Sequence, residues 1–142
     1  MSDKVERMVK VLRQWQGVER DAMTATARIS EQTDSTLIRL LMEIIRHDSH
    51  MHHKVQQFLI DSVTKQSTTV TREDVAAIWE SIGEHDKLEK KTIELAEGLR
   101  ERAWDPSHKL LLEYLLRDEA KHDSLLDQLS EFKSDMNRAS GA

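Results

Sequence analysis

Cysteine is absent from this chain, and proline and glycine are scarce. The 142 residues include no Cys, one Pro and four Gly. Without Cys the chain cannot form disulfides, hold iron–sulfur clusters or use thiolates as nucleophiles or zinc ligands. Pro and Gly are the residues that most often interrupt helices, so their scarcity favours an almost entirely helical protein. Any metal site must then use oxygen and imidazole ligands.

Long apolar runs and an excess of positive charge are also missing. No apolar run approaches the roughly 18 residues of a membrane span, and the N-terminal MSDKVERM lacks the hydrophobic region of a signal peptide. We therefore expect a cytoplasmic protein without membrane contact. The net charge of -5 argues against a nucleic-acid partner, because phosphate binding depends on clustered Lys and Arg. We expect one domain over residues 1–136, followed by a disordered tail at 137–142.

Four segments carry the apolar periodicity of amphipathic helices. We expect them at about residues 3–29, 35–63, 71 to shortly before 105, and 106–132. Ser35 is a plausible N-cap of the second helix, Thr71 opens a variant capping box, and Asp105-Pro106 places an N-cap before proline at the first helical position. The pattern predicts an all-α protein, an antiparallel four-helix bundle built from two repeated helical hairpins.

The chain repeats a set of acidic and histidine residues at a spacing of 70 residues. Glu19 recurs as Glu89, and Asp48-x-x-x-His52 recurs as Asp118-x-x-x-His122. At about 100° per residue, all six residues project into the apolar stripes of their helices. Antiparallel pairing of the helices would bring the four carboxylates to one level near the middle of the bundle.

Four buried carboxylates require a counter-charge. An isolated carboxylate in an apolar interior must become protonated, form an ion pair or bind metal. Two histidines do not neutralise four acids, whereas divalent cations would. Four carboxylates and two histidines inside a helical bundle are the ligand set of a dinuclear site. We therefore expect two divalent metal ions, with iron as the first candidate and manganese or zinc as alternatives.

The fourth helix also contains a Glu-x-x-His motif, Glu119-Ala120-Lys121-His122. With it the chain resembles the ferritin-like di-iron carboxylate proteins, the group of ferritins, bacterioferritins and rubrerythrins. In that family two helices each provide a Glu and the other two each provide Glu-x-x-His. The second helix departs from the pattern, because Ser49 stands where the motif Glu would repeat. We expect Asp118 to contact the metal with Glu119 close behind, and His85 to lie beside the site.

The connection between the second and third helices departs from ferritin as well. It is too short for a crossover along a helix of about 30 residues. Either the second helix ends early or the topology is a simple up-down-up-down bundle.

The resemblance implies chemistry with dioxygen or peroxide, as an oxidase, a peroxidase or a ferroxidase. Rubrerythrin-type peroxidases carry a Cys-rich rubredoxin domain, which is absent here, so electrons would come from a separate donor. We expect a homo-oligomer, with a dimer as the first candidate.

Two other interpretations fit the same residues. In the first, the buried acids and histidines neutralise one another without metal, in a bundle with a structural or protein-interaction role. In the second, His85-x-x-x-Glu89 belongs to a hemerythrin-like oxygen or metal binder. Hemerythrin-like sites are rich in histidine, however, and the first helix has none.

Overall fold

The computed structural model describes residues 2–65 and 70–141, with side chains described as far as residue 135. The secondary structure of this part of the chain is α-helical. They are α1 (Asp3–Glu31), α2 (Thr36–Thr64), α3 (Arg72–Arg102) and α4 (Pro106–Gly141). The predicted all-α class is confirmed.

Polar side chains begin α2, α3 and α4 as the sequence predicts. Ser35 Oγ accepts a hydrogen bond from the backbone N–H of Ile38 at 3.3 Å. Thr71 and Asp74 form a complete capping box, in which each side chain accepts from the other residue's backbone N–H. Asp105 Oδ1 accepts from the backbone N–H of Ser107 at 2.8 Å. Each bond satisfies a donor that the first helical turn leaves without a partner.

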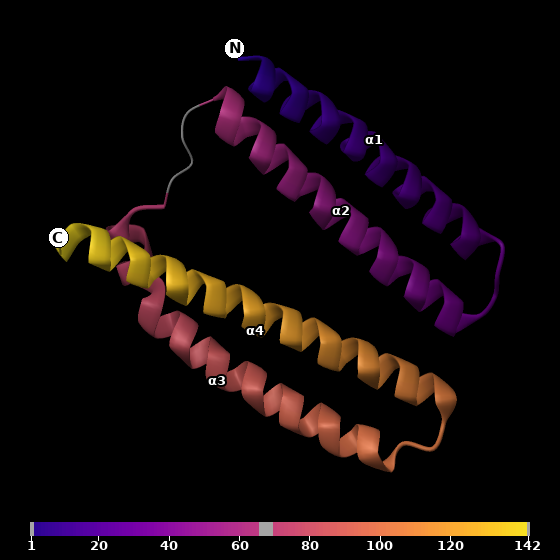
Figure 1. Cartoon of the computed structure of the whole chain (residues 1–142). Coiled ribbons are helices and arrows are strands. Elements are labelled where there is room, and N and C mark those ends of the chain that lie inside the picture. The colour runs from indigo at the N-terminus through magenta and orange to yellow at the C-terminus, as the bar shows by residue number, and fades with distance from the viewer. Residues whose placement is uncertain (1, 66–69, 142) are drawn as a thin grey trace. The chain divides into compact units, whose positions relative to one another are not determined.

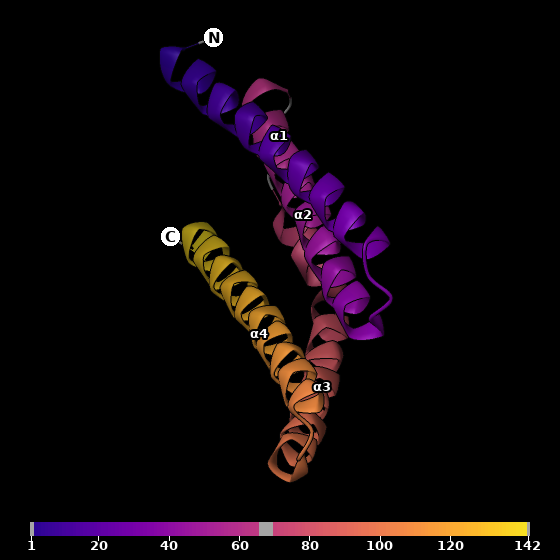
Figure 2. The same cartoon turned by 90° about the vertical axis from the view of Figure 1, so that its right-hand side faces the viewer.

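The four helices of the described residues form two hairpins. α1 packs along α2, and α3 packs along α4 (Figures 1 and 2). Each connection within a hairpin is a few residues long, which favours antiparallel neighbours. The two compact units are Met1–Thr69 and Val70–Ala142. The predicted bundle, in which the two hairpins would meet, stays a prediction. The single domain over residues 1–136 stays a prediction as well.

The helix ends differ from the sequence-based estimates. α1 ends at Glu31, two residues later than expected, and α4 continues to Gly141 instead of ending near Phe132. No proline follows Phe132 to end the helix, and Lys133, Met136, Arg138 and Ala139 are good helix formers. The apolar periodicity, from which the sequence predicts the end near Phe132, does not continue through these residues. The disordered tail predicted at 137–142 lies beyond residue 135, the last residue whose side chain is described. Ala142 lies outside the described residues.

Each hairpin buries little apolar surface on its own. The apolar side chains that are fully buried, among those described, are Leu12, Ile60, Val75 and Ala96. Several residues of the predicted apolar stripes are instead exposed, including Trp15 at 51% and Ile78 at 50%. A pair of helices alone cannot cover a wide apolar stripe on each member. The two helices of each hairpin therefore leave these apolar side chains uncovered.

The exposed apolar surface follows the 70-residue repeat. Six positions carry a large exposed apolar residue in both hairpins: Met8 and Ile78, Val18 and Leu88, Ile29 and Leu99, Leu40 and Leu110, Ile45 and Leu115, and Val55 and Leu125. Burial of exposed apolar groups is favourable by about 25 cal/mol of free energy per Å².

No helix of the described residues has the length and apolar character needed to cross a membrane.

Candidate metal centre

A buried carboxylate lies at the middle of the α3–α4 hairpin. Glu89 on α3 is 5% exposed. Its Oε1 lies 3.1 Å from His85 Nε2, one turn earlier on the same helix, and 3.2 Å from His122 Nδ1 on α4. Its Oε2 is buried and accepts no hydrogen bond from the described residues. One oxygen of this carboxylate thus meets two imidazoles, while the other has no hydrogen-bond donor.

Glu119 completes a group of three with Glu89 and His122. Glu119 Oε2 lies 3.8 Å from His122 Nδ1, and the Glu119 side chain is 19% exposed. One ligand atom from each of the three residues lies within 4.8 Å of the others. A carboxylate from α3, a carboxylate from α4 and an imidazole nitrogen therefore converge, a donor set that suits a first-row divalent metal.

Asp118 contacts the other side of the same imidazole. Its Oδ2 lies 3.5 Å from His122 Nε2, and its Oδ1 lies 2.7 Å from Lys121 Nζ. Asp118 therefore faces away from the atom of His122 that meets Glu89. The sequence predicts Asp118 as the ligand with Glu119 close behind. In the structure Glu119 lies near Nδ1 of His122, as Glu89 does, whereas Asp118 lies near Nε2.

A second group of three shares Glu89. Asp86 and Asp123, both half-buried, each offer an oxygen so that the ligand atoms of Asp86, Glu89 and Asp123 lie within 4.8 Å of one another. Neither Asp86 nor Asp123 is among the metal ligands predicted from the sequence. Asp86 precedes Glu89 by three residues on α3, and Asp123 directly follows His122. The i, i+3 spacing of Asp86 and Glu89 was the available signal.

Lys90 gives the second group an unequal charge distribution. Lys90 Nζ lies 3.1 Å from Asp86 Oδ2. The hydrogen bond from Lys90 lowers the pKa of Asp86, with a further contribution from the hydrogen bond to Asp123. The same Asp86–Asp123 hydrogen bond raises the pKa of Asp123, and partial burial adds to the increase. Asp86 therefore keeps its charge to a lower pH than an isolated aspartate does, whereas Asp123 takes up a proton at a higher pH.

The α1–α2 hairpin repeats part of this arrangement. Glu19 is 8% exposed, and its Oε2 lies 3.3 Å from His52 Nδ1. This contact is within ion-pair distance but outside hydrogen-bond geometry, so Glu19 Oε2 accepts no hydrogen bond from the described residues. No third carboxylate or imidazole of the described part joins Glu19 and His52 within the same range. Asp48 is half-buried, and His52 is exposed in its hairpin.

Neutral side chains occupy two of the equivalent positions in the α1–α2 hairpin. Ser49, 7% exposed, stands at the position of Glu119, and Gln16, 1% exposed, stands at that of Asp86. Gln16 Oε1 accepts from Arg13 at 3.1 Å, and its Nε2 donates to Gln57 Oε1 at 3.1 Å. The buried amide is thereby satisfied within the hairpin.

The predicted site residues are therefore only partly brought together. Glu89, Glu119, His122, Asp118 and His85 lie in one cluster of the α3–α4 hairpin. Glu19 and His52 form a separate pair, accompanied by Asp48 on α2. Whether this pair joins the cluster stays a prediction. The repeat itself is reproduced in the geometry, since equivalent Glu and His residues make equivalent contacts.

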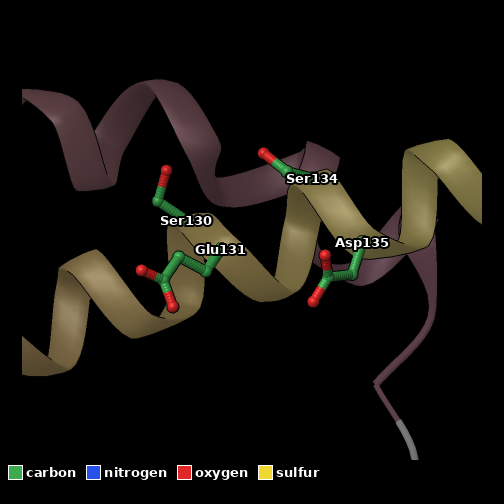
Figure 3. Close-up of a pocket in the computed structure, with 4 residues that line it drawn as sticks. All are labelled: Ser130, Glu131, Ser134 and Asp135. Carbon is green, nitrogen blue, oxygen red and sulfur yellow. The ribbon is translucent and has the colours of Figure 1, made fainter.

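A shallow pocket near the end of α4 does not belong to either group. It has a volume of about 260 Å³ and is lined by Ser130, Glu131, Ser134 and Asp135. Figure 3 shows that these side chains all come from α4. The pocket contains no histidine and no residue of the cluster around Glu89, so it carries no argument for a metal site.

Comparison with known proteins provides no identification. No protein-family model, no curated protein and no solved structure matches the chain. The resemblance to ferritin-like proteins therefore rests on the helical pattern and on the motif residues themselves.

Proposed function

We propose that the α3–α4 hairpin binds a divalent metal ion through Glu89, Glu119 and His122. The observation that carries this proposal is that one ligand atom from each of these three residues lies within 4.8 Å of the others. The Oε2 of Glu89 is also buried without a hydrogen-bond partner among the described residues, and burial of an unsatisfied acceptor costs about 1–3 kcal/mol, more for a charged group. A cation bound to both oxygens of the Glu89 carboxylate would remove that cost.

The distances from His122 to the two carboxylates lie close to those expected around one ion. Two atoms bonded to a metal at about 2.1 Å are about 3.0–3.4 Å apart for bond angles between 90° and the tetrahedral value. His122 Nδ1 lies 3.2 Å from Glu89 Oε1 and 3.8 Å from Glu119 Oε2. A small movement of the flexible Glu119 side chain would complete the arrangement.

Asp118 supports the same assignment. A histidine that binds metal through one ring nitrogen usually donates a hydrogen bond from the other to a carboxylate or carbonyl group. With Nδ1 toward the metal, His122 Nε2 would donate to Asp118, which lies 3.5 Å away. Asp118 would thereby hold the ring in the tautomer and orientation that binding requires.

We further propose that the site holds two ions and that these are iron. The donor set of carboxylates and imidazole suits iron, manganese and zinc, and the Glu-x-x-His motif of α4, which resembles that of ferritin-like proteins, supports iron among them. Bound iron would supply electron transfer to dioxygen or peroxide, as in an oxidase, a peroxidase or a ferroxidase. The chain's own contribution would be to hold Glu89 in a buried position and to orient His122.

The ferritin-like four-helix bundle is part of this proposal. Its support is the repeated exposed apolar surface, which the equivalent surface of the other hairpin would cover. Packing of two such surfaces is the usual way in which helical hairpins complete a core. A homodimer is the alternative arrangement that would cover the same side chains.

A structural network without metal is the second candidate function. It is favoured by the contacts of both His85 and His122 with Glu89 Oε1. Protonation of either imidazole would give Glu89 a cationic partner. The pair of Glu19 and His52, which has no third ligand in its own hairpin, fits this role more closely than a metal site.

Metal uptake tests the proposal directly. The chain would be purified without a metal-affinity tag, stripped of metal, titrated anaerobically with Fe(II) and then exposed to air. We expect iron to remain bound by elemental analysis and the near-ultraviolet absorbance of oxo-bridged ferric iron to rise. The variant Glu89→Gln should lose both signals. Glu113→Gln is the control, because Glu113 lies on α4 and pairs with Arg100 and Arg117 outside both groups of candidate ligands. Uptake by the wild-type chain no greater than that of Glu89→Gln would support the structural network instead.

A further inference from the structure

An apolar pocket of about 400 Å³ lies at the turn that joins α3 to α4. Six of its eight lining side chains are apolar, namely four leucines, Ala103 and Trp104. The other two are Arg102, which is cationic, and His108, which becomes cationic on protonation. Small-molecule sites are concave and mostly apolar, with volumes of about 300–1,000 Å³ and a few polar groups that orient the ligand. The pocket has this composition, and none of the candidate metal ligands lines it.

We propose that this pocket binds a small aromatic carboxylate. The ring of the ligand lies among the leucines and Trp104, and its carboxylate is bound by Arg102. This site is separate from the proposed metal centre, so neither proposal depends on the other.

Trp104 favours an aromatic ligand. Its side chain is 82% exposed, the highest value among the large apolar side chains that the structure describes. A ligand ring packed against the indole would remove apolar surface from water. It would also form the offset or edge-to-face contact that aromatic pairs prefer. An aromatic ligand therefore gains more at this position than an aliphatic ligand of equal size.

Arg102 favours an anionic ligand. The nearby Arg100 pairs with Glu113 at 3.1 Å, whereas Arg102 forms no ion pair in the described part of the chain. A planar guanidinium group binds a carboxylate through two parallel hydrogen bonds. His108 Nε2 lies 3.9 Å from Asp105 Oδ2, so this carboxylate already balances the charge of the histidine when it is protonated. Arg102 is therefore the cation at the pocket that is available to a ligand.

The internal repeat shows that a hairpin turn of this protein does not need these residues. In the α1–α2 hairpin, Asp34 stands at the position of Trp104 and Gln32 at that of Arg102. Arg39 instead stabilises that turn by donating hydrogen bonds to two backbone carbonyl groups. Neither an exposed tryptophan nor an unpaired arginine is thus required by the packing of the turn. A ligand gives both residues a role.

The repeated apolar surface overlaps the pocket in part. Leu99 and Leu115 line the pocket, and their equivalents Ile29 and Ile45 are also exposed. Packing of another protein surface on these leucines would cover some of the apolar lining. It would not supply an anion to Arg102, because the repeated positions are apolar. A small aromatic anion accounts for the lining and the charge together.

Nuclear magnetic resonance of the full-length chain tests the site, with naphthoate as the probe. The chain contains three tryptophans, and the indole N–H signal that is lost in Trp104→Phe identifies Trp104. We expect naphthoate to shift this signal saturably. The signal of Trp15 should stay unchanged, because Trp15 is 51% exposed but lies outside the pocket. Naphthol, which has the same rings and is uncharged at neutral pH, should bind about tenfold more weakly.

Arg102→Gln separates the charge from the apolar lining. Arg102 is exposed, so the change removes no buried contact. It should raise the Kd for naphthoate by about tenfold and leave the Kd for naphthol unchanged. Lys109→Gln is the matched control, because Lys109 directly follows His108 on α4 but does not line the pocket. It should bind both probes as the wild type does.

Four results would overturn the inference. Equal Kd values for naphthoate and naphthol, unchanged in Arg102→Gln, would show general apolar adsorption. Equal weakening in Arg102→Gln and Lys109→Gln would show general attraction to positive charge. Similar shifts of the Trp15 and Trp104 signals would show binding to exposed apolar surface outside the pocket. No shift at all would show that the pocket is covered or takes no such ligand. Metal uptake does not enter this measurement, so its failure is distinguishable from a failure of the proposed function.

Discussion

His122 Nδ1 lies 3.2 Å from Glu89 Oε1, across the interface between α4 and α3. The equivalent pair 70 residues earlier, His52 and Glu19, has its atoms 3.3 Å apart. Both hairpins thus position one buried glutamate against one histidine nitrogen of the facing helix. They differ three residues before the histidine, where one hairpin has Glu119 and the other has Ser49.

This difference predicts that a metal site can be installed in the first hairpin. Ser49→Glu would place a carboxylate three residues before His52, as Glu119 stands before His122. We expect the metal-free variant to lose roughly 1–3 kcal/mol of stability, because Ser49 is buried. It should also bind a further Mn(II) ion, measured by equilibrium dialysis. Ser49→Gln is the control of matching size, and equal uptake by both variants would contradict the prediction.

Glu89→Gln separates a ligand from a structural ion pair. The change keeps the shape of the side chain and removes its charge. If Glu89 serves metal, the metal-free variant should remain within about 1 kcal/mol of the wild type or become more stable, because a buried charge has gone. If Glu89 is needed for an ion pair with His85 or His122, the loss should be about 3–5 kcal/mol. Urea unfolding of the two metal-free proteins measures the difference, and a loss in the upper range would argue against the metal site.

Leu125→Glu tests whether the hairpins meet through the repeated apolar surface. Leu125 is 58% exposed in its own hairpin. If the other hairpin covers it, the variant should be destabilised by about 2 kcal/mol. Val11→Glu is the control, because Val11 is 59% exposed but its equivalent is the polar Ser81. A surface change of this kind should stay within about 0.5 kcal/mol. Equally small effects at both positions would place Leu125 outside any interface.

The capping box at the start of α3 should contribute measurably to stability. Thr71 Oγ1 accepts from the backbone N–H of Asp74 at 3.1 Å. Thr71→Ala removes this acceptor, so we expect a loss of about 1 kcal/mol in thermal or urea unfolding. Thr71→Ser keeps the hydroxyl group and should lose much less. A similar loss in both variants would assign the effect to the missing methyl group.

Asp74 should make the same cap depend on pH. The hydrogen bond from the backbone N–H of Thr71 is the main reason why the pKa of Asp74 is lowered from its ordinary value of 3.8. The folded state therefore holds the carboxylate more strongly than the unfolded chain does. This stabilisation is fully present above pH 3.8 and is lost as the pH falls through the lower, folded-state pKa.

Comparison with Asp74→Asn isolates this effect, because asparagine does not titrate. The wild type should be more stable than the variant at neutral pH, and the difference should shrink as the pH falls below 3.8. Urea unfolding of both proteins at several pH values measures it. A difference that does not change with pH would contradict the prediction.

The sequence by itself determined the helices, their starting residues and the pairing of Glu with His in each half. Capping and amphipathic periodicity are local properties, written in neighbours three or four residues apart, so they can be recognised without a structure. The capping box of Thr71 and Asp74 is a clear instance. The 70-residue repeat likewise identified Glu89 and His122, which the structure brings into contact.

Only the tertiary structure decided which acids complete the cluster. Asp118 and Glu119 are neighbours on one helix and point about 100° apart, so the rotation of α4 against α3 selects Glu119 for the side of His122 that meets Glu89. The same packing brings Asp86 and Asp123 together from different helices, although neither stood out in the sequence. Contacts between helices depend on how side chains on both surfaces interlock, and residue spacing within one helix does not specify that.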